Sequence, residues 1–177
     1  MNGSTSTRRP AQALLGARWL LSANGSSPSA ARITADWRAR RLGEIRVGRI
    51  FELIRVTDQR LGQVAFEDLL RARVPVGPVL LNLPLGAVEF LTTAVPEPGW
   101  SMPDSEHLTR QLTRSSWVTV KVPPPGPYRI DGRVWLRAPD GGQALTSPAN
   151  LATALSRARS LMRRAPAVAG RCLSRTP

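Results

Sequence analysis

Hydrophobic residues recur at helical spacing near both ends of the chain. Residues 11–22 carry leucine and tryptophan side chains that give a helix one broad apolar side. Ser27-Pro28 predicts the start of a second helix, because the hydroxyl can accept a free N–H and proline fits the first helical position. Gly43 ends this helix, and Ser147-Pro148 repeats the same start before a closing helix over 149–162.

The middle of the chain changes to an extended pattern. A helix capped by Thr57 or Asp58 and running to about Ala72 separates two apolar runs, and this order predicts a βαβ unit with a right-handed crossover. Turn residues separate the remaining elements. The expected strands cover 45–47, 50–56, 79–81, 88–92, 117–122 and 133–137, and a short helix is expected over 105–112.

These patterns predict one α+β domain with disordered ends. Residues 1–10 and 164–177 have no hydrophobic period, so we expect them to be disordered. Between them lie an N-terminal helical segment, 11–43, and the α+β domain itself, 44–163. The 177 residues, of which 42% are hydrophobic, suffice for one apolar core.

The cysteine content and the length of the apolar runs indicate the cellular compartment. A single cysteine, Cys172, excludes an intrachain disulfide and a metal site built on several cysteines. The longest apolar run near the N-terminus, 13–21, is interrupted by Gly16 and Arg18 and is too short for a bilayer span. We therefore expect a cytoplasmic protein with no membrane partner.

Positive charge is concentrated at the two ends of the chain. The net charge is +13, yet residues 44–140, with twelve basic and eleven acidic side chains, contribute only +1 of it. Residues 1–43 and 141–177 contribute +6 each. Such charge favours nucleic acid or another anion as partner. Because 24 of the 25 basic residues are arginine, the codon bias of a GC-rich genome explains the ends equally well.

Six motifs in a fixed order carry a resemblance to a known family. They are Arg49-Ile50-Phe51-Glu52-Leu53-Ile54-Arg55-Val56, Pro75-Val76-Gly77-Pro78-Val79-Leu80, Val88-Glu89-Phe90-Leu91, Trp117-Val118-Thr119-Val120-Lys121-Val122 with its proline run, Arg133-Val134-Trp135-Leu136, and Leu145-Thr146-Ser147-Pro148. From about Gly43 to Arg157 the chain resembles the bifunctional DNA primase/polymerase (prim-pol) domain, in its short stand-alone form from high-GC bacteria. The resemblance implies an RRM-like mixed sheet within the α+β class.

The resemblance implies that active members use two carboxylates at a strand end, a histidine on the next hairpin and a further acid. The carboxylates hold the Mg²⁺ ions for phosphoryl transfer. The chain departs from this pattern at each point. The strand end reads Glu52-Leu53-Ile54-Arg55, so only one acid remains and Arg55 stands near the expected metal position. Residues 85–89 contain no histidine, and the strand before the proline run contains no acid. The resemblance thus extends to the fold and not to the activity. We expect a degenerate, non-catalytic site with no cofactor.

Two acids and one histidine remain as weak catalytic candidates. Glu52 and Glu89 interrupt apolar strand runs and could share a metal ion, but strand alternation explains both more simply as solvent-exposed positions. His107 has Glu106 beside it and no serine or cysteine at a suitable spacing, so we expect a surface histidine.

Aromatic and basic positions on two strands form a candidate nucleic-acid interface. Strands that carry rings and cations on one face bind single strands in RRM-like sheets. Trp117 and Lys121 share one strand face, and Arg133, Trp135 and Arg137 share another, although Trp135 could equally be core. The basic ends add a second set of phosphate-binding candidates: Arg8, Arg9, Arg38, Arg40, Arg41, Arg157, Arg159, Arg163 and Arg164.

Three functions stay open. The first is a non-catalytic prim-pol-like module with weak nucleic-acid (DNA or RNA) or anion binding. The second is a divergent metal-dependent nucleotidyl transferase that uses Mg²⁺ with Glu52 and Glu89. The third is a regulatory domain that binds a protein partner through the loop containing Trp100 or the loop 123–127. The sequence leaves the oligomeric state undetermined.

Overall fold

A computed structural model describes residues 8–25, 27–109, 118–142 and 144–164. Within these ranges the chain is mixed α+β, as the pattern predicts. The helices are α1 (Arg8–Ser22), α2 (Ser27–Arg38), α3 (Gln59–Arg71) and α4 (Pro148–Arg164), with a 3-10 turn η1 (Leu83–Leu85). The strands are β1 (Gly43–Arg46), β2 (Glu52–Val56), β3 (Val79–Asn82), β4 (Ala87–Thr92), β5 (Ser105–Leu108), β6 (Thr119–Val122), β7 (Arg129–Ile130) and β8 (Arg133–Arg137).

The strands form two sheets. The larger has the order β5-β2-β4-β3-β8-β7, and the smaller pairs β1 with β6. Strands β2 and β3 both run antiparallel to β4, which lies between them, so β2 and β3 are parallel and joined through α3. The predicted βαβ unit is therefore present as a split unit.

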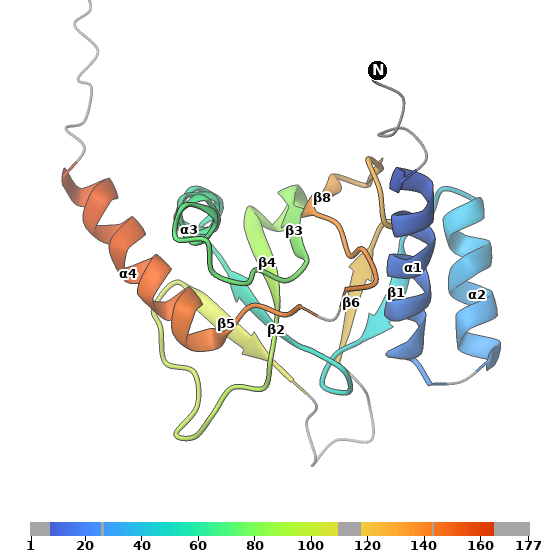
Figure 1. Ribbon diagram of the computed structural model, residues 1–177, viewed down its shortest axis with the longest axis horizontal. Helices are drawn as coiled ribbons and strands as arrows, with labels where there is room; N and C mark the ends of the chain where they lie inside the picture. The colour runs from blue at the N-terminus through green and yellow to red at the C-terminus, as the bar shows by residue number, and fades with distance from the viewer. Residues whose placement is uncertain (1–7, 26, 110–117, 143, 165–177) are drawn as a thin grey trace, which may run out of the picture.

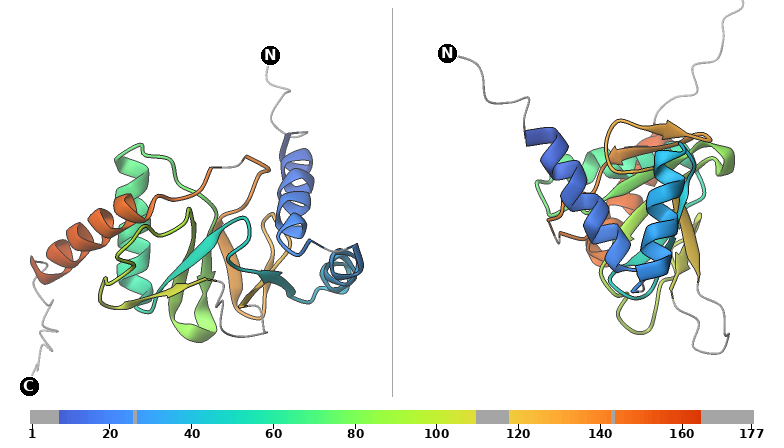
Figure 2. Two further views of the ribbon diagram at one scale, coloured as in Figure 1. Left: turned by 90° about the horizontal axis from the view of Figure 1, so that it is seen from below. Right: turned by 90° about the vertical axis from the view of Figure 1, so that its right-hand side faces the viewer.

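Two apolar clusters lie on the two faces of the large sheet. Alternate residues of β2 divide between them: Ile54 and Val56 face α3 and α4, while Leu53 faces the small sheet and the α1–α2 pair. Figure 1 shows α3 and α4 on one side of the large sheet and α1 and α2 on the other, beyond β1 and β6. Figure 2 shows the same arrangement from below and from the α1–α2 side.

A local signal explains the start of α3, whereas the predicted end of α2 at Gly43 is wrong: α2 ends at Arg38 and Gly43 is the first residue of β1. Asp58 caps α3, since its carboxylate accepts a hydrogen bond from the Leu61 N–H at 2.9 Å. Gly62 on α3 lies so close to strand β4 that an added Cβ would be 2.6 Å from Val88 Cβ. Small residues at such contacts allow the helix to approach the sheet closely.

One predicted element is wrong. Residues 105–108 form strand β5 and not part of a helix, because β2 has a free edge there and pairs with them in register, Ile54 opposite His107. An edge strand leaves backbone groups unpaired, and pairing with β5 satisfies them. The rest of the predicted helix, 110–112, lies outside the described residues.

The ends of the chain are described only in part. The first helix begins at Arg8, earlier than expected, so residues 8–10 are helical and not disordered. Helix α4 runs to Arg164, the first residue of the tail expected to be disordered, so Arg164 is helical. The disorder expected for residues 1–7 and 165–177, the latter including Cys172, concerns residues outside the description. No helix in the described ranges has the length and apolar character needed to cross a bilayer.

Candidate nucleic-acid interface

Glu89 is a buried member of an ion-paired row across the large sheet. Its side chain is 0% exposed, which contradicts the expectation of a solvent-exposed strand position. Arg55, directly opposite on β2, donates from Nε to Glu89 Oε1 at 2.9 Å and from Nη1 to Glu106 Oε2 at 3.2 Å. Asn82 donates to the same Glu89 oxygen at 3.1 Å. Arg55 thus neutralises the buried carboxylate of Glu89.

Glu52 has a different environment at the end of β2. Its carboxylate accepts hydrogen bonds from the Val95 N–H at 2.8 Å and from the Thr109 hydroxyl at 2.8 Å, and it lies 2.7 Å from His107 Nε2. Partial burial acts to raise the pKa of Glu52, but these hydrogen bonds and the His107 charge outweigh it and hold that pKa below its ordinary value. His107 therefore contacts Glu52 across the strands and not its sequence neighbour Glu106.

The two candidate carboxylates cannot share a metal ion. Glu89 is in direct register with Arg55, so the two side chains lie on one face of the sheet, toward the small sheet. Glu52 is three residues from Arg55 on the same strand and therefore lies on the opposite face, with Ile54. Across the described ranges, no cluster of three or more histidine, cysteine or acidic side chains could hold a metal.

The aromatic strand positions are not brought together as a stacking surface. Trp135 is only 7% exposed, packs in the core beneath the small sheet, and donates from Nε1 to the Pro123 carbonyl at 3.1 Å. Its ring is therefore core and unavailable to a base. Lys121 is exposed on β6 and lies 3.7 Å from Glu44, whereas Arg133 on β8 is half-buried, with an Nε that has no partner in the described chain. Trp117 lies outside the described residues.

A basic groove lies between the end of α2 and the segment that follows the proline run. It has a volume of about 720 Å³. The α2 side supplies a threonine, a tryptophan and two arginines, and the other side supplies residues of the 124–131 segment. The lining residues are Thr34, Trp37, Arg38, Arg40, Pro124, Tyr128, Arg129, Ile130 and Asp131.

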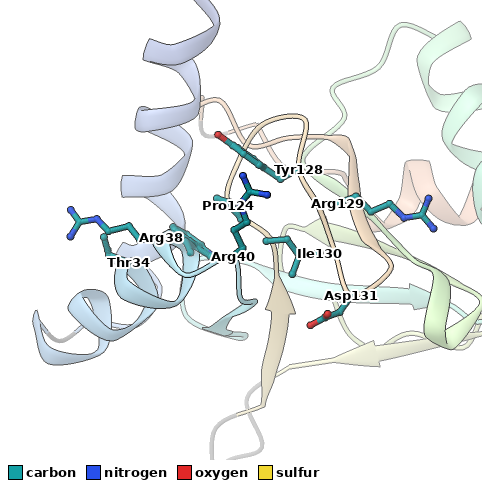
Figure 3. A pocket seen from close by; sticks show the side chains of 9 residues that line it. Thr34, Arg38, Arg40, Pro124, Tyr128, Arg129, Ile130 and Asp131 are labelled. Atoms are coloured by element: carbon teal, nitrogen blue, oxygen red, sulfur yellow. The ribbon is translucent and has the colours of Figure 1, made fainter.

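Aromatic and cationic side chains meet at the centre of this groove. In Figure 3, Arg40 extends from the end of α2 toward Pro124 and Tyr128, while the guanidinium groups of Arg38 and Arg129 point outward on either side. Arg40 has a positive φ of 55°, a left-handed conformation that follows the last turn of α2. This conformation ends α2 in a Schellman motif, in which the Arg41 N–H donates to the Asp36 carbonyl at 2.8 Å and the Arg40 N–H donates to the Trp37 carbonyl at 3.1 Å.

The cations of the groove are free to bind an anion. No acidic side chain of the described chain pairs with Arg38, Arg40 or Arg129, and one acid, Asp131, lines the groove. By contrast, Arg41, predicted to act with them, lies 2.7 Å from Asp36 and lines a neighbouring cleft in which positive and negative side chains nearly balance. Of these two adjoining sites, the basic groove has the larger excess of positive side chains.

The basic residues of the C-terminal helix are more dispersed. Arg157 pairs with Asp68 at 3.6 Å, and Arg159 pairs with Asp104 and also donates to the Pro103 carbonyl. Arg163 and Arg164 are exposed in the last turn of α4, where cations interact favourably with the helix dipole. The side chains of Arg8 and Arg9 lie outside the description.

The sequence pattern alone does not reveal three residues of the groove. None of Trp37, Tyr128 and Arg129 is among the binding candidates drawn from the sequence. The available signal was a lone tyrosine followed by arginine, immediately after five residues of which four are proline. Comparisons with family models, with curated proteins and with solved structures found no match to this chain.

Proposed function

We propose that this chain is a non-catalytic, prim-pol-like module that binds nucleic acid weakly through the basic groove between α2 and the 124–131 segment. The observation that carries the proposal is one groove lined by Tyr128, Trp37 and three arginines, none of which has an acidic partner in the described chain. Guanidinium groups bind phosphate oxygens, and such contacts supply most of the nonspecific affinity for nucleic acid.

Polymerase chemistry has no support in the carboxylates. Two-metal phosphoryl transfer requires acidic side chains that converge on the metal ions. Glu52 and Glu89 lie on opposite faces of the sheet, and Arg55 occupies one oxygen of Glu89. A divergent nucleotidyl transferase built on these two residues therefore lacks a shared Mg²⁺ site.

Binding is tested with fluorescently labelled oligonucleotides whose anisotropy is measured between about 50 mM and about 200 mM salt. The test variant carries Arg38→Gln, Arg40→Gln and Arg129→Gln. The matched control carries Arg60→Gln, Arg73→Gln and Arg163→Gln, three exposed arginines outside the groove, so both proteins lose the same net charge.

We expect the groove variant to lose most of the affinity and the control to lose little. The logarithm of the binding constant falls linearly with the logarithm of the salt concentration, and each lost phosphate contact reduces the steepness of this line by about 0.7 for a single strand. The three substitutions of the groove variant should therefore reduce the steepness by about 2. Equal losses in the two variants would show diffuse charge and no defined site. Co-purification of a specific protein partner that persists at high salt would favour a protein-partner role. Metal-dependent primer extension that is lost in Glu52→Ala would restore the transferase.

A further inference from the structure

A second, more apolar groove adjoins the basic one. It has a volume of about 550 Å³ and lies between the start of α1 and the proline loop. Its walls are mostly proline and alanine, with the first turn of α1 on one side and the end of β8 on the other. The lining includes Pro10, Ala13, Pro125, Pro127, Ala138 and Pro139.

Tyr128 is the residue that the two grooves share. It lines both of them, and it is 52% exposed, so much of its ring is open to a ligand. Gly126 supports the ring: a Cβ built there would be 3.0 Å from Tyr128 Cε2, and its φ of 126° excludes most other residues. The ring is therefore packed along one edge against the backbone of its own loop.

Each of the two grooves that Tyr128 lines also contains arginine. Arg40 lies in the basic groove, and Arg137 lines the apolar one at the end of β8. Asp140 also lines the apolar groove, but its carboxylate accepts a hydrogen bond from the Gly142 N–H within its own turn. A mostly apolar space with room for a nucleobase is thus lined by Tyr128 and Arg137, and it adjoins the basic groove that contains Arg40.

We propose that the apolar groove receives a nucleobase stacked on Tyr128, so that the ligand of this interface is a single-stranded nucleic acid. Consecutive phosphates on either side of the base would then contact Arg40 and Arg137. In a duplex the bases are paired and stacked inside the helix and cannot reach the ring. Sequence-tolerant stacking on aromatic side chains is the mode that single strands use, because every base has a π-face.

This inference rests on the proposed function and is tested separately from it. Three probes are used: a labelled single strand, the same strand annealed to its complement, and inorganic polyphosphate as a polyanion without bases. The variants are Tyr128→Ala and Tyr128→Phe, with Leu85→Ala as the control, an apolar side chain that is about as exposed as Tyr128 and lies outside both grooves.

We expect Tyr128→Ala to weaken single-strand binding by roughly five- to a hundredfold, the range found when a stacking aromatic is removed. Tyr128→Phe should bind like the unsubstituted protein, and polyphosphate and duplex affinities should not change in either variant. Because the chain has one tyrosine, selective ¹³C labelling gives a single set of ring signals. Stacking on a base should shift these signals upfield with the single strand and leave them in place with polyphosphate.

The outcomes separate the two proposals. If binding depends on the groove arginines but the affinities for duplex and single strand are equal, or if Tyr128→Ala leaves the single-strand affinity unchanged, the base site is overturned and the proposed function stays intact. No binding of any probe at low salt, or equal effects of the two triple arginine variants, would overturn the proposed function and this inference with it.

Discussion

The buried pair of Arg55 and Glu89 permits a quantitative test of the sheet. Replacement of Arg55 by methionine removes the only cation that contacts Glu89 in the described chain and leaves a 0% exposed carboxylate with one amide donor, Asn82. Removal of one partner of a buried pair costs about 3–5 kcal/mol in unfolding free energy. The whole stability of a domain of this size is about 5–15 kcal/mol, so the variant should be marginally folded.

Replacement of the other partner, Glu89→Gln, should lower the unfolding free energy by less than Arg55→Met does. In Glu89→Gln the guanidinium of Arg55 keeps Glu106 as a partner and is itself 21% exposed, so solvent compensates part of the loss. We expect a loss of about 1–3 kcal/mol, the range for hydrogen bonds to charged groups. The double variant should lose less than the sum of the two single variants, because both remove the same interaction.

Urea unfolding followed by circular dichroism measures these differences. Arg71→Met serves as control, since Arg71 forms an exposed pair with Glu67 in which both side chains are more than half exposed. Exposed pairs contribute at most about 1 kcal/mol. If Arg55→Met cost no more than Arg71→Met, the placement of Glu89 in the core would be refuted.

Three further predictions concern local contacts. Because the pKa of Glu52 is lowered in the folded chain, its carboxylate adds stability above its unfolded pKa, and this stability is lost as the pH falls through the folded pKa. In urea titrations from neutral to acidic pH, the difference in unfolding free energy between the unsubstituted protein and Glu52→Gln should therefore shrink. A constant difference would contradict this prediction. Gly62→Ala should cost about 1–3 kcal/mol in thermal unfolding, because its Cβ would be 2.6 Å from Val88 Cβ, whereas an unchanged melting temperature would mean that α3 can move away freely. Asp58→Ala should cost about 0.5–2 kcal/mol by loss of the α3 cap, and Asp58→Ser should recover most of it; equal losses would exclude the cap.

Elements with a strong local pattern were predictable from the sequence. The α3 helix combines a capping aspartate with apolar residues at helical spacing, and the structure confirms it from Gln59 to Arg71. Strand β5 was mispredicted because its four residues have no strong pattern of their own. Their conformation depends on pairing with β2, which lies about 50 residues earlier in the chain.

The interface was predictable only in part. Arg38 and Arg40 were expected to bind nucleic acid from their charge, and the structure places both in the basic groove. Tyr128 and Arg129 come from a segment about 90 residues later, and no local pattern indicates that these segments meet. The burial of Glu89 was missed for a related reason, since strand alternation gives the face of a residue but not whether a second sheet covers that face.

The pairing of β1 with β6 has a consequence for the order of folding. It joins Gly43 to Val122, and through it the α2 end of the basic groove meets the segment that begins at Pro124. Contacts so distant along the chain require closure of a long loop, which costs entropy before any contact compensates it and slows folding. During synthesis the groove cannot form until the 124–131 segment has left the ribosome, so we expect the basic groove to form late, after the α3 unit has folded.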